Sequence, residues 1–284
     1  MKPGVIERRM TGIGIGIAFI LMWLLQGWVM RVIVTALGVL AVWEMVTALE
    51  HTGAKPMRWV CVGYMALCMP VCHFFFGFTG LFLWTVIAAC VGLCATMLLS
   101  DVKADAPVPT IFPILYPGAF FGVLLELTYL QPRVQCTVVY CLVYVSAMLN
   151  DVAAYEIGTL YGKTPLAPRL SPKKTVEGSL AGIAASILVC ALVPAFVRWV
   201  CSVLPFMGVW AESTVPSVWI CALFGLIGGL ASQAGDLCAS MIKRHCGIKD
   251  YGTIFPGHGG VMDRMDGILF SGVCACVFFV LTMR

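Results

Sequence analysis

The sequence predicts an all-α integral membrane protein with about nine transmembrane helices. Hydrophobic residues make up 61% of the 284-residue chain and charged residues only 11%, whereas soluble proteins carry about 25% charged residues. Many apolar runs reach the roughly 17–25 residues that a helix needs to cross a bilayer. The charged residues gather in a few short segments between these runs. Together these observations indicate a polytopic helical protein.

Each apolar run is assigned to one helix. The predicted spans, in chain order, are 11–28, 32–50, 57–76, 79–99, 111–130, 134–160, 178–199, 217–242 and 266–283. The first two follow each other so closely that a re-entrant pair stays an alternative. The sixth and eighth are longer than one bilayer thickness, so their C-terminal ends should extend into water.

Basic residues set the expected orientation. With the N-terminus in the cytoplasm, 14 of the 18 Lys and Arg residues fall on the cytoplasmic side; the other four are Arg31, Arg133, Arg198 and Arg284. Such an excess of positive charge on one side is typical of multi-pass proteins. It places the polar loops 161–176 and 243–265 on the same face, where they can meet. We therefore expect about five helices in residues 1–130 and a functional region in residues 131–284.

Two glutamates, Glu44 and Glu126, fall inside predicted spans. An intramembrane carboxyl group is by default a functional residue, but a protonated glutamic acid can also bond a neighbouring helix. The residues leave both roles open.

A stripe of polar side chains follows the eighth span. Ser232, Asp236, Ser240 and Lys243 are separated by steps of four, four and three residues, which places them on one helix face. Part of the stripe should lie within the bilayer. Asp236 therefore needs a cation nearby, either a lysine or a metal ion.

A glycine-rich turn, residues 256–260, follows this helix and contains His258. Asp263 and Asp266 come next and share one face if a helix begins there. Carboxylates around flexible backbone favour a hard divalent cation such as Mg²⁺. Zinc is disfavoured because His258 has no companion ligand at the usual spacing. A purely structural ion-pair network stays an alternative.

A second polar segment follows the sixth span. Asn150 and Asp151 lie on the cytoplasmic half of that helix. The run Ser171–Gly178 is interpreted as a helix entry, with Ser171 as the cap and Pro172 in the first turn. Free N–H groups there, beside the lysines at 173 and 174, suit a phosphate. The alternative is a capped helix whose lysines reach the lipid headgroups.

These features together predict a Mg²⁺-dependent enzyme that acts on a phosphorylated substrate at the cytoplasmic membrane face. The cations available to balance a polyphosphate near the first segment are Lys243, Arg244, Lys249 and Arg264. The spacing of the residues does not identify the substrate.

The motif from Ser240 to Asp266, with its Pro-Gly-His-Gly-Gly-Val-Met-Asp-Arg-Met-Asp core, resembles the C-terminal motif of the phosphatidate cytidylyltransferases, or CDP-diacylglycerol synthases. Asn150-Asp151, Ser171–Gly178 and Gly235-Asp236 resemble further blocks of that family, in the same order. The resemblance covers about residues 150–272. Upstream, only the apolar character and the Trp43-Glu44 pair are similar.

The resemblance implies that CTP and phosphatidic acid condense to CDP-diacylglycerol and pyrophosphate. It implies Mg²⁺ as the cofactor and leaves open whether a second cation is bound. It implies metal binding by Asp236, Asp263, Asp266 and Asp151, and catalytic roles for Asp236, Asp263, Lys243, Lys249 and Asp266. The implied substrate-binding residues are Asn150, Asp151, Ser171, Lys173, Lys174, Glu177, Ser240, Arg244, His258, Gly259, Gly260 and Arg264. His258 is expected to hold the loop or a phosphate, because an ionised phosphate needs no general base.

Two other functions stay open at this point. An ion-coupled secondary transporter would predict repeated halves, which the sequence lacks. Another phospho-alcohol transferase would require a motif that fails after Asp266-Gly267. The expected location is the inner (cytoplasmic) membrane, with the bilayer as a partner, no nucleic acid, and a homodimer as an open alternative.

Overall fold

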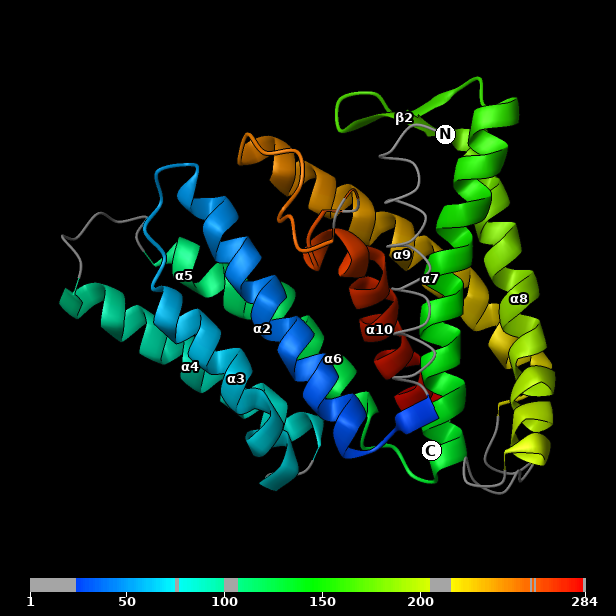
Figure 1. The fold of residues 1–284 in the computed structure, drawn as a ribbon, viewed down its shortest axis with the longest axis horizontal. Helices are drawn as coiled ribbons and strands as arrows, with labels where there is room; N and C mark the ends of the chain where they lie inside the picture. The colour runs from blue at the N-terminus through cyan, green and yellow to red at the C-terminus, as the bar shows by residue number, and fades with distance from the viewer. Residues whose placement is uncertain are drawn as a thin grey trace. The chain divides into compact units, whose positions relative to one another are not determined.

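Helices form nearly all of the described protein (Figure 1). The computed structural model describes residues 24–74, 77–99, 107–204, 216–255, 257 and 259–282. The elements are α2 (Trp28–Glu50), α3 (Arg58–Phe74), α4 (Phe78–Leu99), α5 (Val108–Pro113), the π-helical η1 (Ile114–Ala119), α6 (Phe120–Leu127), α7 (Arg133–Tyr161), β1 (Pro165–Ala167), β2 (Ser171–Thr175), α8 (Val176–Val203), α9 (Val218–His245) and α10 (Met262–Thr282). The predicted class is confirmed as nearly all-α.

Six helical segments of the described chain are long and apolar enough to cross a membrane. They are Trp28–Glu50, Phe78–Leu98, Val108–Leu127, Arg133–Tyr161, Val176–Val203 and Val218–His245. Helix α3 is apolar but shorter, with 17 residues. The protein is therefore a multi-pass membrane protein, whereas the predicted count of nine spans is not confirmed. Most of the predicted first span, 11–28, lies outside the described residues.

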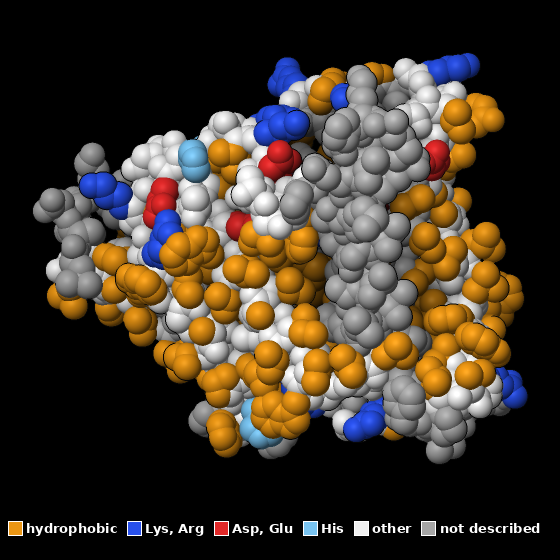
Figure 2. Space-filling view, in the orientation of Figure 1, with side chains coloured by type: hydrophobic (Ala, Val, Ile, Leu, Met, Phe, Trp, Pro, Cys, Tyr) orange, Lys and Arg blue, Asp and Glu red, His pale blue; other side chains and the backbone are white. Residues whose placement is uncertain are grey.

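Apolar side chains cover the outside of the helices. Trp59, Leu98 and Trp219 are 79%, 82% and 83% exposed. Figure 2 shows hydrophobic side chains over much of the described surface on the face that it draws. An apolar surface of this kind is favourable against lipid tails and unfavourable in water. The exposed faces are thus suited to a bilayer.

The described residues up to Thr128, together with those of Ile242–Met265, form one compact unit. Within it α2 packs against α3 and α6, and α3 packs against α4. A Cβ atom at Gly38 would lie 2.7 Å from Met65 Cε. The glycine therefore permits the close contact of α2 with α3.

The described residues of 129–241, together with those from Asp266 to Thr282, form a second compact unit. Helices α7 and α8 lie side by side along their lengths (Figure 1). The Ser186 hydroxyl donates to the Gly225 carbonyl of α9 at 2.8 Å. The hydroxyls of Ser146 and Ser271 join α7 to α10 at 2.8 Å. Small polar residues at such crossings let helix backbones approach closely and supply hydrogen bonds that lipid cannot.

The segment 165–175 corrects the sequence prediction. It forms an antiparallel hairpin in which Ser171 pairs with Ala167 of β1, and the helix begins only at Val176. Proline at 172 disfavours helical backbone at the residue before it. Thr175 then supplies the helix cap, because its hydroxyl accepts the Gly178 N–H at 3.2 Å. Ser171 is therefore a strand residue and not the cap of α8.

Candidate active site

A pocket of about 420 Å³ opens in the second unit. Helix α7, the hairpin, the start of α8 and the middle of α9 supply its walls. Its lining residues are Asp151, Ala154, Tyr155, Gly158, Thr159, Leu166, Lys173, Lys174, Thr175, Ser179, Gln233 and Asp236. Four predicted site residues therefore meet in one cavity: two carboxylates from helices and two lysines from β2.

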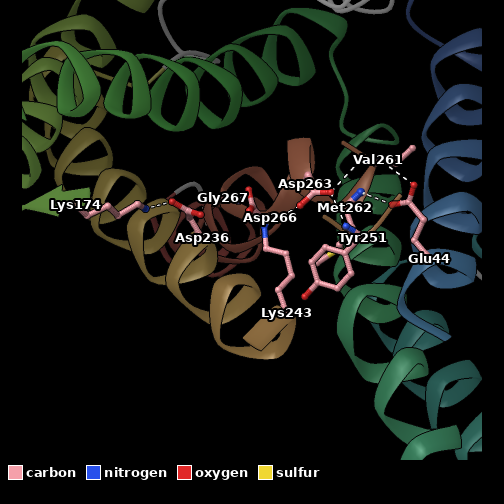
Figure 3. A network of polar contacts seen from close by, with 11 residues as sticks. Glu44, Lys174, Asp236, Lys243, Tyr251, Val261, Met262, Asp263, Asp266 and Gly267 are labelled. Atoms are coloured by element: carbon pink, nitrogen blue, oxygen red, sulfur yellow. Dashed lines mark hydrogen bonds and ion pairs between the residues drawn. The ribbon is translucent and has the colours of Figure 1, made fainter. Parts of the chain in front are cut away.

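The central contact of this pocket is an ion pair between Lys174 of β2 and Asp236 of α9 (Figure 3). The two side chains are 30% and 22% exposed, so both reach the pocket while remaining partly shielded from solvent. The sequence predicted that Asp236 needs a cation, and Lys174 fills that role. Partial shielding from water strengthens the attraction between the two charges of such a pair.

Close helix packing brings the hairpin to α7. A Cβ atom at Gly158 would lie 3.0 Å from the Thr175 hydroxyl. Asp151, Tyr155 and Gly158 follow one another by four and three residues and so share one face of α7. The absence of a side chain at position 158 lets the hairpin approach this face and close the pocket.

A partly buried hydrogen-bond network fixes two of the residues that line the pocket. The Gln233 amide of α9 donates to Asn150 Oδ1 and to the Ser179 carbonyl, each at 2.9 Å. The Ser179 hydroxyl in turn donates to Gln233 Oε1. Asn150 is fully buried and does not line the pocket. Asn150 thus lies behind the pocket lining and holds the Gln233 side chain in position.

Sequence reasoning missed Gln233 and Ser179. Gln233 is three residues before Asp236 on α9, and that spacing alone would have placed the two side chains on the same face. Ser179 gives no comparable signal, since a serine in a membrane helix commonly bonds its own backbone.

Glu177 holds the loop that carries the two lysines. Its carboxylate accepts the backbone N–H groups of Lys163 and Thr164 at 3.1 and 3.2 Å, and the Thr164 hydroxyl at 2.9 Å. A carboxylate with three donors is a strong fixed contact between the two ends of the hairpin. The sequence predicted Glu177 as a substrate-binding residue. In the structure its hydrogen bonds to Lys163 and Thr164 position the hairpin.

A second cluster lies in the first unit, at the glycine-rich turn (Figure 3). Asp263 Oδ1 accepts Lys243 Nζ at 2.8 Å. Asp263 Oδ2 accepts the N–H groups of Tyr251 and Gly260 at 2.8 and 3.0 Å. The carboxylate side chain is only 3% exposed. Three donors around one buried carboxylate fold the turn onto the first residues of α10.

Two glycines make this turn feasible. Gly257 and Gly259 have φ of +73° and +84°, values that side chains with a Cβ atom adopt only with strain. The Phe255 N–H donates to the Gly259 carbonyl at 2.9 Å, which closes the turn. The sequence predicted flexible backbone here, and the described residues form a turn with specific bonds.

The remaining predicted residues differ in burial. Asp266 is buried in α10, where its Oδ1 accepts the Gly267 N–H at 2.8 Å. The side chains of Arg244, Lys249 and Arg264 are exposed, and those of Ser240 and Ser171 are half-buried. His258 lies outside the described residues. Within the described ranges, no three His, Cys, Asp or Glu residues are grouped as a metal site.

Comparison with known proteins identifies the family. Residues 6–282 match the cytidylyltransferase family. The chain is 36% identical over 185 residues to the phosphatidate cytidylyltransferase of Mycobacterium bovis, covering 64% of this chain and 52% of that protein. It is 37% identical over 171 residues to that of Aquifex aeolicus, covering 60% and 55%.

A plant relative is matched over more of its length. The chain is 30% identical over 302 aligned positions to the chloroplastic phosphatidate cytidylyltransferase 5 of Arabidopsis thaliana, covering 96% of this chain and 71% of that protein. The chain spans about half the length of the bacterial relatives above. The match to the family itself covers almost the whole sequence, so this membrane protein belongs to the cytidylyltransferase family.

Proposed function

We propose that the protein is a phosphatidate cytidylyltransferase that converts CTP and phosphatidic acid to CDP-diacylglycerol and pyrophosphate. The names of its relatives support this reaction. The structural observation that carries it is the pocket lined by Asp151, Lys173, Lys174 and Asp236 on a protein whose surface suits a bilayer. Cations and carboxylates in one cavity suit a phosphorylated substrate.

The reaction would proceed by in-line displacement at the α-phosphorus of CTP. An oxygen of the phosphatidate phosphate forms a bond to that phosphorus, and the bond from the α-phosphorus to the oxygen that bridges the α- and β-phosphates breaks, so that this oxygen leaves with pyrophosphate. Lys173 would bind the phosphates, and Lys174 would stabilise the negative charge that develops on the leaving group. Asp236 would hold Lys174 in the orientation that this requires.

The carboxylates of the pocket fit a divalent cation. An ionised aspartate offers about four acceptor positions, and Mg²⁺ is commonly held by one or two carboxylates together with substrate phosphates. We infer that Asp151 and Asp236 would hold Mg²⁺. When bound, the ion would neutralise phosphate charge and assist departure of pyrophosphate. Asp263 already accepts three N–H groups, so as a metal ligand it stays a prediction from the sequence, as does Asp266.

The experiment that tests the function uses the purified full chain in lipid nanodiscs. CTP labelled at its α-phosphate, phosphatidic acid and Mg²⁺ are supplied, and lipid-soluble label is measured. We expect labelled lipid that depends on phosphatidic acid, with one pyrophosphate released per product. Absence of labelled lipid with every phosphatidic acid tried, together with ion-coupled uptake into vesicles, would favour a transporter instead.

The two pocket lysines are expected to respond differently to loss of charge. Lys173 is exposed, and we expect it to bind the substrate phosphates equally in the ground state and the transition state. Lys173→Gln should therefore raise KM for CTP by about three- to tenfold with little change in kcat. Lys174→Gln should lower kcat, because Asp236 also loses its partner. Lys163→Gln, in the same loop but outside the pocket, is the control. Equal effects of all three variants on KM and kcat would contradict the assignment.

The arrangement in the membrane is also proposed. We infer nine spans, a cytoplasmic N-terminus and a pocket that opens at the cytoplasmic face of the inner membrane. The distribution of Lys and Arg along the sequence supports this orientation. Access of a labelling reagent from the cytoplasmic side to a cysteine introduced at Lys163 would test it.

A further inference from the structure

Glu44, near the C-terminal end of α2, contacts a part of the chain more than 200 residues away (Figure 3). Its Oε1 accepts the Val261 N–H at 3.0 Å, and its Oε2 accepts the Met262 N–H at 2.8 Å. Both contacts lie within the first unit. Glu44 is only 5% exposed, so these bonds are shielded from competing water.

The surrounding turn has two glycines against this carboxylate. A Cβ atom at Gly252 would lie 2.9 Å from Glu44 Cδ, and one at Gly260 would lie 2.5 Å from it. Either side chain would push the carboxylate or the turn aside. Both positions are therefore suited to a buried carboxylate between them.

Helix α10 needs such a partner, because its own sequence supplies no cap. The first N–H groups of a helix have no acceptor within the helix, and the residue before α10 is Val261, whose side chain cannot accept a hydrogen bond. The Arg264 and Met265 N–H groups donate to the Val261 carbonyl at 3.0 and 3.1 Å, as expected for a residue at the cap position. Glu44 supplies the missing acceptor from another helix.

Two carboxylates thus bind three successive backbone N–H groups. Asp263 accepts that of Gly260, and Glu44 accepts those of Val261 and Met262. A negative charge at a helix N-terminus is also favoured by the helix dipole. These two carboxylates form a clamp that holds the first turn of α10, which carries Asp263.

We propose that Glu44 is a positioning residue for cytidylyl transfer, which fixes the first turn of α10 and through it Asp263, whose catalytic role the sequence predicts. This inference rests on the proposed function. A small displacement of a site residue can lower turnover by about 10²-fold. Glu44 would act on kcat through geometry, without contact with a substrate.

The test replaces Glu44 with Gln, which has nearly the same shape but only one acceptor oxygen. The new NH₂ group then faces the N–H group of Val261 or Met262, and one of the two hydrogen bonds is lost. In Glu44→Gln we expect at least tenfold faster hydrogen–deuterium exchange in a peptide spanning residues 252–265. We also expect kcat to fall by about 10–10²-fold with KM for CTP changed by less than threefold. Glu44→Asp, which keeps the charge but shortens the side chain, should give the same pattern.

The chain offers a matched control in Glu126. It lies in α6 of the same unit and is also 5% exposed, and its electrostatic neighbours are Cys72 and Arg31. Glu126→Gln should leave exchange in residues 252–265 unchanged. Exchange in α7 and α8 should be unchanged in every variant, which verifies that the protein is folded.

Gly252→Ala gives an independent perturbation of the same clamp. It should reproduce the faster exchange and lower kcat, and combining it with Glu44→Gln should add little, because residues that share one contact are not additive. Normal exchange and normal kcat in Glu44→Gln overturn the inference, as does an equal effect of Glu126→Gln. Absence of transfer by the unmodified protein overturns the proposed function, and the catalytic part of this inference with it, while the exchange data still decide whether the clamp exists.

Discussion

Asp236→Asn is expected to lower kcat for cytidylyl transfer by about 10²–10³-fold, the loss typical of removing one fixed electrostatic contact from an active site. Asparagine has nearly the same shape, so the helix and the hydrogen bonds of Gln233 to Asn150 and Ser179 should persist. The variant loses the negative charge that pairs with Lys174 and that would hold a cation. Both losses act on the charge that develops during the transfer.

The Mg²⁺ dependence separates these two contributions. If Asp236 holds the ion, Asp236→Asn should shift the Mg²⁺ concentration for half-maximal activity upward, and saturating Mg²⁺ should restore only part of kcat. Titration of activity against Mg²⁺ at fixed CTP and phosphatidic acid measures this shift. A Mg²⁺ concentration for half-maximal activity equal to that of the unmodified protein would show that Asp236 is no metal ligand.

Glu156→Gln is the matched control for this charge change. Glu156 is on α7, next in sequence to the pocket residue Tyr155, and its side chain is exposed outside the pocket. Loss of its charge should change kcat by less than twofold. A large effect there would indicate that net charge near the membrane, and not the pocket, controls activity.

The positions of Asp236 and Lys243 on α9 illustrate what sequence patterns can predict. Helix periodicity is local, so a stripe of polar residues predicts which side chains share a face. The need for a cation beside Asp236 follows from the cost of an unpaired charge in an apolar environment. Neither argument identifies which lysine supplies the cation, since that depends on how the chain returns to α9.

Glu44 and the hairpin show where local patterns fail. The contact of Glu44 with Val261 joins residues far apart in sequence, and only the packing of α2 against the turn creates it. In the hairpin, Ser171 and Pro172 favoured a helix start by composition, but strand pairing and the Thr175 cap decided the boundary. By contrast, the helix periodicity that places Asp236 on the polar face of α9 could also have predicted that Gln233 lies on that face.

Asp263→Asn is expected to destabilise the protein strongly, by about 3–5 kcal/mol, the usual cost of removing one partner from a buried ion pair. Lys243 and Asp263 are 15% and 3% exposed and lie 2.8 Å apart. The substitution leaves the Lys243 charge uncompensated, and the new NH₂ group opposes backbone N–H donors of the turn. Unfolding by SDS in mixed micelles, followed by tryptophan fluorescence, measures the loss.

Lys243→Met should cost less than Asp263→Asn, because the carboxylate keeps the two N–H groups of Tyr251 and Gly260. In the double variant the two costs should not add, since residues in direct contact couple by about 0.5–3 kcal/mol. Glu50→Gln is the control. It breaks an ion pair with Arg58 whose side chains are 39% and 25% exposed, and such pairs contribute only about 0–1 kcal/mol.

The relative sizes of these losses of stability distinguish the buried ion pair of Lys243 and Asp263 from the exposed pair of Arg58 and Glu50. If Asp263→Asn costs no more than Glu50→Gln, the turn does not depend on the carboxylate, and the observed bonds to Tyr251 and Gly260 contribute little. If the cost is large and Lys243→Met is the milder change, the backbone N–H groups carry most of the interaction. Asp263 then serves the fold of the glycine-rich turn first, and any role in binding a cation must use the one acceptor position that these three donors leave.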